Sequence, residues 1–413
     1  MHRGPGKIFL QIQHLIFWSS LDSPRFDLAS PVPTCLLAVF WALRITAVKI
    51  KGFGRTGRVY DTIYTMAQET AVNADDLVIP IINFSHFLSG PPSQRLRTAQ
   101  TILNGFQTAG FIYLSHHPIP TDTLSHTFSH SAQFFARPQP QKDALAWTTP
   151  SSNRGYVIHG REKTTTLTNK SDVEALKAAA PDLKESFEIG REGVPDMPNN
   201  WPAASASDPA AQEFKDTMLA FHDQCKELHI NVMRAIALGL GLDEGYFDGY
   251  TDAGDNTLRL LHYPETKRSV FRANKMQVRA GEHTDYGSIT LLFQDDRGGL
   301  QVRSPKGTYV DATPVEGTVV VNAGDLLARW SNDRIKSTLH RVVEPPAKPS
   351  AEAKEGGEDV VYPARYSIAY FCNPNFDRMI EAIEGTYGGE LGERKYKDIN
   401  SGDYLVQRLA ATY

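Results

Sequence analysis

Three side chains in the second half of the chain are of the types that bind a transition-metal ion. His283 and Asp285 stand two residues apart, so on an extended strand both side chains leave the same face and can bind one ion. His340 follows Asp285 after 54 intervening residues of strand-like runs and turns, which is enough chain for antiparallel strands to return a third ligand. Two imidazoles and one carboxylate hold non-haem ferrous iron and leave positions open for oxygen and substrate. The pattern predicts iron-dependent oxidation chemistry.

The His-x-Asp pair alone is weak evidence, because most such pairs form a solvated turn or cap a helix. Arg365 and Ser367 strengthen it: on a predicted strand they share a face and offer a guanidinium fork and a hydroxyl to a carboxylate. Tyr263 could supply a phenol to the same anion or to a neighbouring ligand. Taken singly, Arg365 is better explained by a surface ion pair and Tyr263 by core packing. Together they favour an anion held near a metal.

Further segments between about Leu77 and Ile383 form a recognisable series. They are Ile79–Ser85, Gly110–His117, Asn153–Tyr156, Asn200–Pro202, Leu258–Pro264, Gly281–Gly287, Gly299–Val302, Asn322–Asp325 and His340–Val342. In this order they resemble the 2-oxoglutarate and Fe(II)-dependent dioxygenases, in the branch that includes isopenicillin N synthase and the plant flavonoid and gibberellin oxidases.

The resemblance implies a set of iron ligands, which are His283, Asp285 and His340. It implies that Arg365 and Ser367 anchor the distal carboxylate of 2-oxoglutarate and that Tyr263 contacts this cosubstrate near its other end. Three coordination positions then remain on Fe(II), two for 2-oxoglutarate and one for O2. The implied reaction oxidises a C–H bond of a small organic molecule and releases succinate and CO2. Hydroxylation is the default outcome, with desaturation or ring closure as alternatives.

The substrate is less readable from the sequence. Relatives place the segment Asn153–Tyr156 over the substrate, so Arg154 and Tyr156 are candidate substrate contacts; a turn entering a strand explains them equally well. The other histidines near the family segments, His86, His116, His117 and His262, are not assigned to the metal, since such residues more often have structural hydrogen bonds. Asn322–Asp325 is expected to be a turn between strands in which Asp325 fixes the backbone.

Three positions depart from the family pattern. Asn83 stands where an acidic residue is usual, which we interpret as a structural position, and Leu261 stands where plant members often have Asn, so one hydrogen bond to the cosubstrate is expected to be missing. The segment Glu344–Asp359 is an insertion rich in Pro, Gly, Ala and charge, and we expect a mobile loop over 344–361. The loop is either an inert surface segment or a lid over the site, and its lack of apolar residues favours the first.

The composition is that of an ordinary globular protein. The 413 residues are 41% hydrophobic and carry a formal charge of −4, so neither a nucleic-acid surface nor a membrane protein is predicted. Cys35, Cys225 and Cys372 are too few and too scattered for a disulfide framework or a zinc cluster. A reducing compartment, the cytoplasm, and a monomer acting on a small molecule are expected.

The first 75 residues match no segment of the family. Residues 1–60 carry eight Lys or Arg against two Asp, and the apolar run Cys35–Leu43 is well short of the ~20 residues that a membrane span needs. The alternatives are a poorly ordered extension, a mispredicted gene start and a weak anchor, of which the first two are favoured. We therefore expect an extension over 1–75 and a dioxygenase domain over 76–413.

Periodicity predicts the elements of that domain. Region 76–240 is expected to be mainly helical, with a helix over Ser93–Ala109 that ends at Gly110. The longest helix is expected to begin after Asp208 as its cap and to end near Gly241. Strands are predicted over Ser288–Gln294, Leu300–Arg303, Tyr309–Thr313, Thr318–Asn322, Ser337–Val343 and Arg365–Cys372. The series predicts an α+β fold with a jelly-roll core, a double-stranded β-helix, over 258–375 and flanking helices.

Two other functions share these residues. An oxidase of the isopenicillin N synthase type would not use 2-oxoglutarate, and Arg365 with Ser367 would hold a substrate carboxylate instead. Stoichiometric succinate release distinguishes the two. A non-catalytic binding protein would be favoured by a missing ligand, and none is missing. A role in specialised metabolism is expected from the divergent extension and insertion.

Overall fold

The computed structural model describes residues 50–53, 59–62, 68–167, 169–205, 208–346 and 360–412. The chain divides into two compact units, Met1–Glu69 and Thr70–Tyr413. In the first unit, strands β1 (Ile50–Phe53) and β2 (Val59–Thr62) pair antiparallel. The predicted extension otherwise falls mostly outside the described residues.

The second unit begins earlier than the expected boundary after residue 75. Strand β3 (Thr70–Ala74) pairs with β4 (Leu77–Asn83) and buries Val72. Asp75 and Asp76 close the turn with φ of 51° and 63°, a left-handed conformation that short polar side chains tolerate. Because β3 is short and buries only one apolar side chain well, its sequence has no alternation of polar and apolar residues from which a strand could be predicted.

Among the described residues of the second unit, two large sheets face each other. The larger sheet has the strand order β3, β4, β5 (Phe111–Ser115), β14 (Thr318–Ala323), β11 (Ile289–Gln294), β17 (Arg365–Cys372), β8 (Thr257–Tyr263), β7 (Glu185–Gly190) and β6 (Gly155–Val157). The smaller sheet has the order β10 (Ala280–His283), β15 (His340–Val342), β12 (Leu300–Arg303) and β13 (Tyr309–Asp311). Each of the six predicted strand segments overlaps an observed strand, and β14 extends one residue beyond its predicted end.

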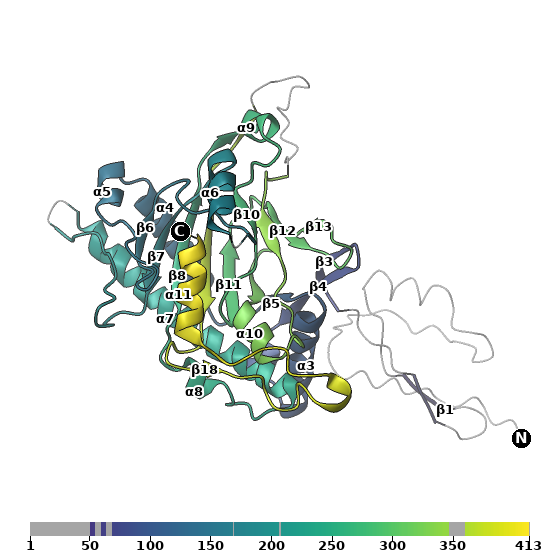
Figure 1. The fold of residues 1–413 in the computed structure, drawn as a ribbon. Helices are drawn as coiled ribbons and strands as arrows, with labels where there is room; N and C mark the ends of the chain where they lie inside the picture. Colours follow the sequence, from purple (N-terminus) through teal and green to yellow (C-terminus); the bar gives the residue numbers. More distant parts are fainter. Residues whose placement is uncertain are drawn as a thin grey trace, which may run out of the picture. The chain divides into compact units, whose positions relative to one another are not determined.

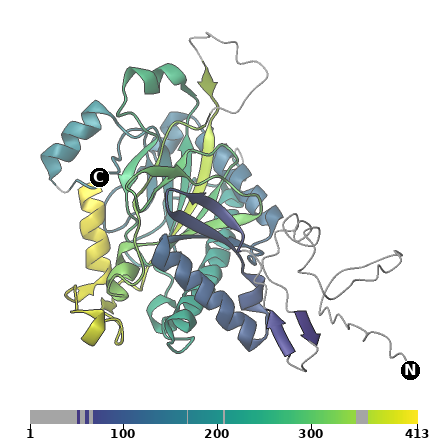
Figure 2. The same cartoon turned by 90° about the vertical axis from the view of Figure 1, so that its right-hand side faces the viewer.

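Three long helices cover the face of the larger sheet that is turned away from the smaller one (Figures 1 and 2). They are α3 (Pro92–Thr108), α4 (Thr121–Phe135) and α7 (Ala210–Leu240). Their apolar faces pack on Leu258, Leu291 and other residues of the sheet to form the main core. A second core cluster, which includes Tyr263, Leu300 and Val302, involves both sheets.

The predicted helix ends are close to the observed ones. Helix α3 is followed by Gly110 with φ of 73°, and α7 ends at Gly241 with φ of 79°, the left-handed conformation that glycine adopts at helix ends. The cap position of α7 is Pro209 and not Asp208 as predicted, and the Asp208 carboxylate pairs with Arg137 at 2.5 Å.

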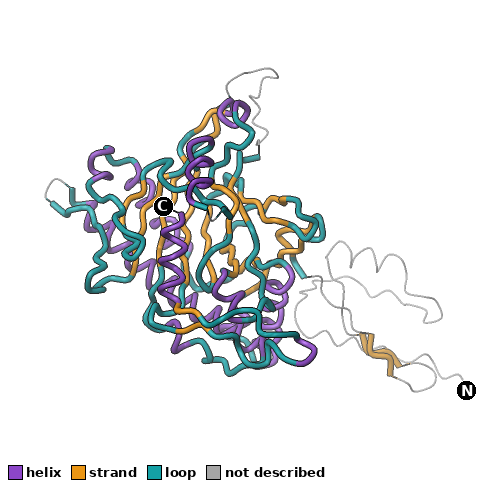
Figure 3. The backbone as a smooth tube through the Cα atoms, in the orientation of Figure 1, coloured by secondary structure: helices purple, strands orange, loops and turns teal. Residues whose placement is uncertain are grey.

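The region 76–240 contains more helix than strand, but β4, β5, β6 and β7 alternate with its helices and extend the larger sheet (Figure 3). Every residue of β7 is buried, including charged ones, so this strand lacks the polar and apolar alternation by which a strand is recognised.

Shorter elements complete the second unit. The helices are α2 (Ser85–Leu88), α5 (Gln139–Asp143), α6 (Lys170–Ala179), α8 (Asp248–Thr251), α9 (Arg268–Ala273), α10 (Asp325–Trp330), the 3₁₀ turn η1 (Gly389–Leu391) and α11 (Ser401–Thr412). The short strands are β9 (Thr266–Lys267), β16 (Val361–Tyr362), β18 (Met379–Ile380) and β19 (Ile399–Asn400). Within the described part of the chain, no helix is long and apolar enough to cross a membrane.

Candidate metal and cosubstrate site

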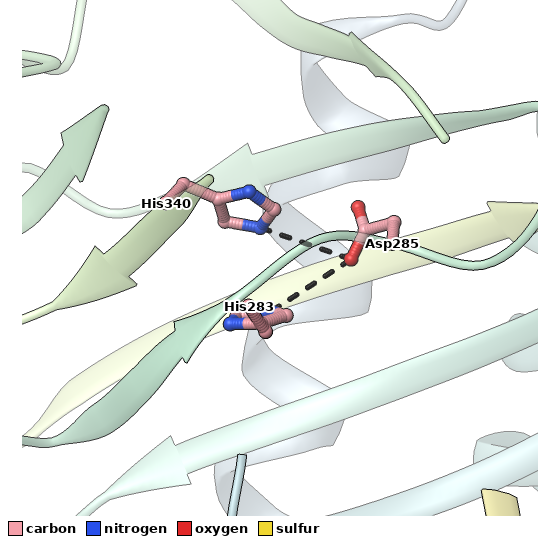
Figure 4. Close-up of side chains that lie close together, drawn as sticks. All are labelled: His283, Asp285 and His340. Carbon is pink, nitrogen blue, oxygen red and sulfur yellow. Dashed lines mark ion pairs between the residues drawn. The ribbon is translucent and has the colours of Figure 1, made fainter. Parts of the chain in front are cut away.

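The three predicted metal ligands lie together (Figure 4). His283 ends β10, His340 begins β15, and the two residues are paired across these antiparallel strands. Asp285 lies two residues beyond the end of β10, and its Oδ1 is 3.8 Å from His283 Nε2 and 3.7 Å from His340 Nε2. The candidate ligand atoms all lie within 4.8 Å of one another. Small side-chain adjustments would bring them to an ion at the usual ~2.0–2.2 Å.

The hydrogen bonds of these side chains fit a metal. Nδ1 of His283 lies 2.8 Å from Gly281 O, and Nδ1 of His340 lies 3.1 Å from Thr338 O, so each ring can donate there and keep its Nε2 lone pair for an ion. Burial, reinforced by His340, lowers the pKa of His283 to about 3, which keeps its imidazole neutral. The donor set therefore suits Fe(II).

The carboxylate of Asp285 is also oriented by its neighbours. Its Oδ2 accepts hydrogen bonds from Thr290 Oγ1 at 2.5 Å and from Asn322 Nδ2 at 2.7 Å, which leaves Oδ1 turned toward the histidines. Burial would raise the pKa of this carboxyl, but the two histidines and these hydrogen bonds hold it below its ordinary value. Thr290 and Asn322 lie opposite each other on β11 and β14.

Asp325 fixes the backbone of the ligand loop. Its N–H donates to Asp285 O at 2.8 Å, while its carboxylate accepts from Ser337, Tyr404 and Arg408. Arg408 of α11 also lies over the Tyr286 ring, 4.4 Å from its centroid. Helix α11 thereby secures the segment next to Asp285.

The three residues predicted to bind the cosubstrate are also close together. Arg365 on β17 is paired with Tyr263 on β8, and its guanidinium lies 4.8 Å from the Tyr263 ring centroid. Arg365 Nη1 donates to Ser367 Oγ at 3.1 Å, and Nη2 donates to Gln294 Oε1 at 3.2 Å. The Gln294 Nε2 group is buried and has no acceptor among the described residues. Such unsatisfied donors beside a buried arginine fit a carboxylate ligand.

The structure disagrees with the expected substrate contact of Tyr156. Its ring is buried in the core on the helix-covered side of the sheet, near Phe134, and its hydroxyl donates to Glu185. Arg154 is also buried, with Nη1 donating to the carbonyls of Ser152 and Asn153, and its guanidinium occupies the space where Gly190 lacks a Cβ.

A buried charged group on the same side of the larger sheet as Tyr263 was missed in the sequence. Arg259 is paired with Glu188 at 2.7 Å and with Glu162 at 3.2 Å, and Lys184 contacts Glu162 at 2.6 Å. Burial would raise the pKa of Glu162, but Arg259 and Lys184 lower it to about 2. Because side chains alternate between the two faces of a strand, the even spacing of Arg259 and Tyr263 on β8 is a sequence signal that would have placed both side chains on the same face of the sheet.

Arg259 also lies next to an aromatic side chain beside the ligands. Its guanidinium is 5.0 Å from the ring centroid of Phe371, whose backbone partner on β11 is Thr290.

Asn83 has the structural role expected of it, since its Oδ1 accepts hydrogen bonds from Ser85 N and Oγ at the start of α2.

This fold and site define the class of protein. The chain belongs to the 2OG-Fe(II) oxygenase superfamily, which it matches over residues 254–374, and residues 79–204 match the N-terminal region of non-haem dioxygenases in morphine synthesis. It is 34% identical to the 2-oxoglutarate-Fe(II) type oxidoreductase hxnY of Emericella nidulans, over 81% of this chain and 90% of that protein.

Solved structures of a Neurospora crassa protein, crystallised at full length with alpha-KG, are more similar still. Its complex with alpha-KG and thymine is 62% identical, with a TM-score of 0.75, over 84% of this chain and 100% of that one. Its complex with alpha-KG and 5-formyluracil is 58% identical, with a TM-score of 0.73 and the same coverage. The predicted class is confirmed: the protein is an Fe(II) and 2-oxoglutarate-dependent dioxygenase that oxidises a small organic molecule.

Proposed function

We propose that this dioxygenase oxidises the 5-methyl group of a free pyrimidine base, with thymine as the first substrate. The observation that carries the proposal is the 62% and 58% identity to the Neurospora crassa protein crystallised with thymine and with 5-formyluracil. These two bases differ only in the oxidation level of the carbon attached to C5. The proposal narrows the general expectation of a small organic substrate.

We assign the iron to His283, Asp285 and His340, and the 2-oxoglutarate to Arg365, Ser367 and Tyr263. The bound iron and cosubstrate supply the oxidising chemistry, and the side chains of the chain orient the reactants and exclude water. Supporting this assignment, one candidate ligand atom from each of the three residues lies within 4.8 Å of the others, and Arg365 is buried beside Tyr263. Arg365 would pair with the distal carboxylate through its guanidinium fork.

We assign the substrate ring to the neighbourhood of Phe371 and Arg259. An aromatic face suits the planar base, and a guanidinium suits its ring carbonyls. The two carboxylates that hold Arg259, on Glu162 and Glu188, keep its guanidinium beside Phe371. The predicted substrate contact of Arg154 stays a proposal. We leave Tyr156 out of the proposed contacts, because its ring packs in the core on the helix-covered side of the sheet.

We infer a jelly-roll core from the order of the strands. Strands β8, β11, β14 and β17 lie in the larger sheet, while β10, β12, β13 and β15 form the smaller one. The chain thus passes repeatedly between the two sheets, with only β12 and β13 consecutive in the same one, and these eight strands pair antiparallel. The strands β3 to β7 would then extend the larger of the two jelly-roll sheets at its edges.

A reducing compartment such as the cytoplasm is proposed from the free, buried thiols of Cys225 and Cys372, and a monomer is proposed as the working form.

Succinate release tests the substrate proposal. The purified protein with Fe(II), ascorbate, O2 and 2-oxoglutarate is incubated with thymine, with uracil or with thymidine, and succinate is quantified. We expect thymine to raise succinate release at least tenfold over uracil, which lacks the methyl group, and mass spectrometry to find 5-hydroxymethyluracil. Thymidine tests whether the base must be free. Equal succinate release with thymine and uracil would refute the proposed substrate.

A further inference from the structure

Arg279, which immediately precedes β10, is an arginine next to the candidate cosubstrate site that no motif singled out. Its side chain is fully buried, and its guanidinium carbon lies 5.9 Å from the ring centroid of Tyr263. Arg365 lies 4.8 Å from the same centroid. Two buried guanidinium groups are thus close to one phenol ring.

The hydrogen bonds of Arg279 are incomplete within the described residues. Nε and Nη1 are buried and have no acceptor there, and Nη2 makes one long contact with Pro363 O at 3.4 Å. The carboxylate of Asp295 is engaged elsewhere, since it accepts from the backbone N–H groups of Arg297 and Tyr366. Arg279 therefore has donors for a planar anion that this part of the protein does not provide.

The energetic cost of this arrangement also indicates an anion. A buried charge is costly unless it is paired and hydrogen-bonded. Burial and, next, the charge of Arg365 lower the pKa of Arg279 to about 10, in the direction expected for a buried cation that is not fully compensated by its surroundings. Gln294, which accepts from Arg365, likewise keeps a buried amide Nε2 without an acceptor among the described residues. A carboxylate bound here would offer acceptors to these unpartnered donors.

We propose that Arg279 is a second arginine of the cosubstrate site and that it binds the distal carboxylate of 2-oxoglutarate together with Arg365. This inference rests on the proposed assignment of Arg365, Ser367 and Tyr263 to that cosubstrate. The two arginines select for a 2-oxo acid with a second carboxylate, and the ligand in turn neutralises their mutual repulsion. Arg279 contributes to cosubstrate affinity and not to metal binding.

Calorimetric binding to the Mn(II)-loaded protein tests this without turnover. The probes are 2-oxoglutarate and oxalate, which can chelate the metal but has no distal carboxylate. Arg279→Met should weaken 2-oxoglutarate binding roughly 10- to 100-fold, the loss of charge-assisted hydrogen bonds, and leave oxalate binding unchanged. Urea unfolding without ligand should show no loss of stability, because the substitution removes an uncompensated charge. The matched control is Arg272→Met, at an exposed arginine of α9.

Each other result overturns the inference. Unchanged 2-oxoglutarate affinity, equal weakening of both ligands, or a large loss of stability without ligand would give Arg279 a structural role. If Arg279→Met does not fold, Arg279→Lys keeps the charge without the fork and should still weaken 2-oxoglutarate more than oxalate. Arg365→Met distinguishes failure of the cosubstrate site from failure of the role of Arg279. If both Arg365→Met and Arg279→Met leave 2-oxoglutarate affinity unchanged, the proposed cosubstrate site is wrong. If only Arg279→Met leaves it unchanged, the site stands and the proposed role of Arg279 is wrong.

Discussion

His283 and His340 face each other across the β10–β15 pair, with ring centroids 4.3 Å apart. Their positions are fixed by the register of two paired strands, so the backbone sets the spacing of the two imidazoles before any metal binds. Asp285 lies beyond the end of β10 and depends instead on side-chain hydrogen bonds for its orientation.

The first prediction concerns those hydrogen bonds. Thr290→Val and Asn322→Leu remove the two donors that turn Asp285 Oδ1 toward the histidines, so each should weaken metal binding by roughly 10- to 100-fold. Thr290→Ser keeps the hydroxyl, so this variant should bind the metal ion with nearly the affinity of the unaltered protein. Competition of a chelator for bound Co(II) measures the affinity. Metal affinity that is unchanged in both variants would mean that Asp285 needs no support.

Arg365→Lys separates cosubstrate binding from metal binding. The substitution keeps a positive charge but loses the bidentate fork, so 2-oxoglutarate affinity should fall by at least tenfold while metal affinity persists. Calorimetry with Mn(II) gives both constants. If 2-oxoglutarate affinity does not change, Arg365 holds something other than the cosubstrate, such as a carboxylate of the substrate.

The buried pair of Glu162 and Lys184 predicts a dependence of stability on pH. The folded-state pKa of Glu162 is lowered from 4.5 to about 2, which corresponds to about 3 kcal/mol of stability. This contribution is fully present above pH 4.5 and is lost as the pH falls through 2. Glu162→Gln should therefore lower the free energy of unfolding by roughly 3–5 kcal/mol at pH 7, since it also leaves Lys184 without its partner.

Urea unfolding at pH 7, 4 and 3 checks this prediction. The difference between the two proteins should shrink at the lowest pH. Glu213→Gln, at an exposed carboxylate 3.6 Å from His130, is the control and should change stability by less than about 0.5 kcal/mol. A difference that is the same at pH 3 and pH 7 would exclude a depressed pKa as its cause.

The insertion between His340 and Arg365 carries another prediction, although residues 347–359 lie outside the described part of the chain. Its composition favours an inert surface loop over a lid. Replacing residues 347–359 with a short Gly-Ser linker should keep substrate oxidation coupled to succinate formation at close to one to one. A large excess of succinate over oxidised product would identify the segment as a lid.

The residues that could be located from the sequence are those whose spacing follows one strand. Arg365 and Ser367 are two residues apart on β17, and the side-chain alternation of that strand brings them together as predicted. His283 and Asp285 have the same spacing, but β10 ends at His283, so Asp285 reaches the site from the following loop and not from the expected strand. Thr290, Asn322 and Arg279 could not be found in this way. Their roles depend on contacts between different elements, such as that of Asn322 with a carboxylate 37 residues away.

The segment Asn153–Tyr156 shows the opposite limit. It was interpreted either as a substrate contact or as a turn entering a strand, and the observed turn before β6 agrees with the second interpretation. Asn153 and Gly155 have φ of 46° and 103°, and these left-handed residues change the direction of the backbone just before the short strand β6. Tyr156 thus reaches the helix-covered core. The face to which a side chain points therefore cannot be predicted from the sequence by counting alternate residues through such a turn.

Isotope labelling tests the central claim most directly. Thymine is incubated with the Fe(II)-loaded protein and 2-oxoglutarate under 18O2, and the products of a single oxidation are analysed by mass spectrometry. The account predicts one 18O atom in succinate and one in the 5-hydroxymethyl group, apart from exchange with water, with both absent in His283→Ala. Thymine recovered unlabelled and unchanged, while succinate forms at the rate seen without it, would contradict the proposed function.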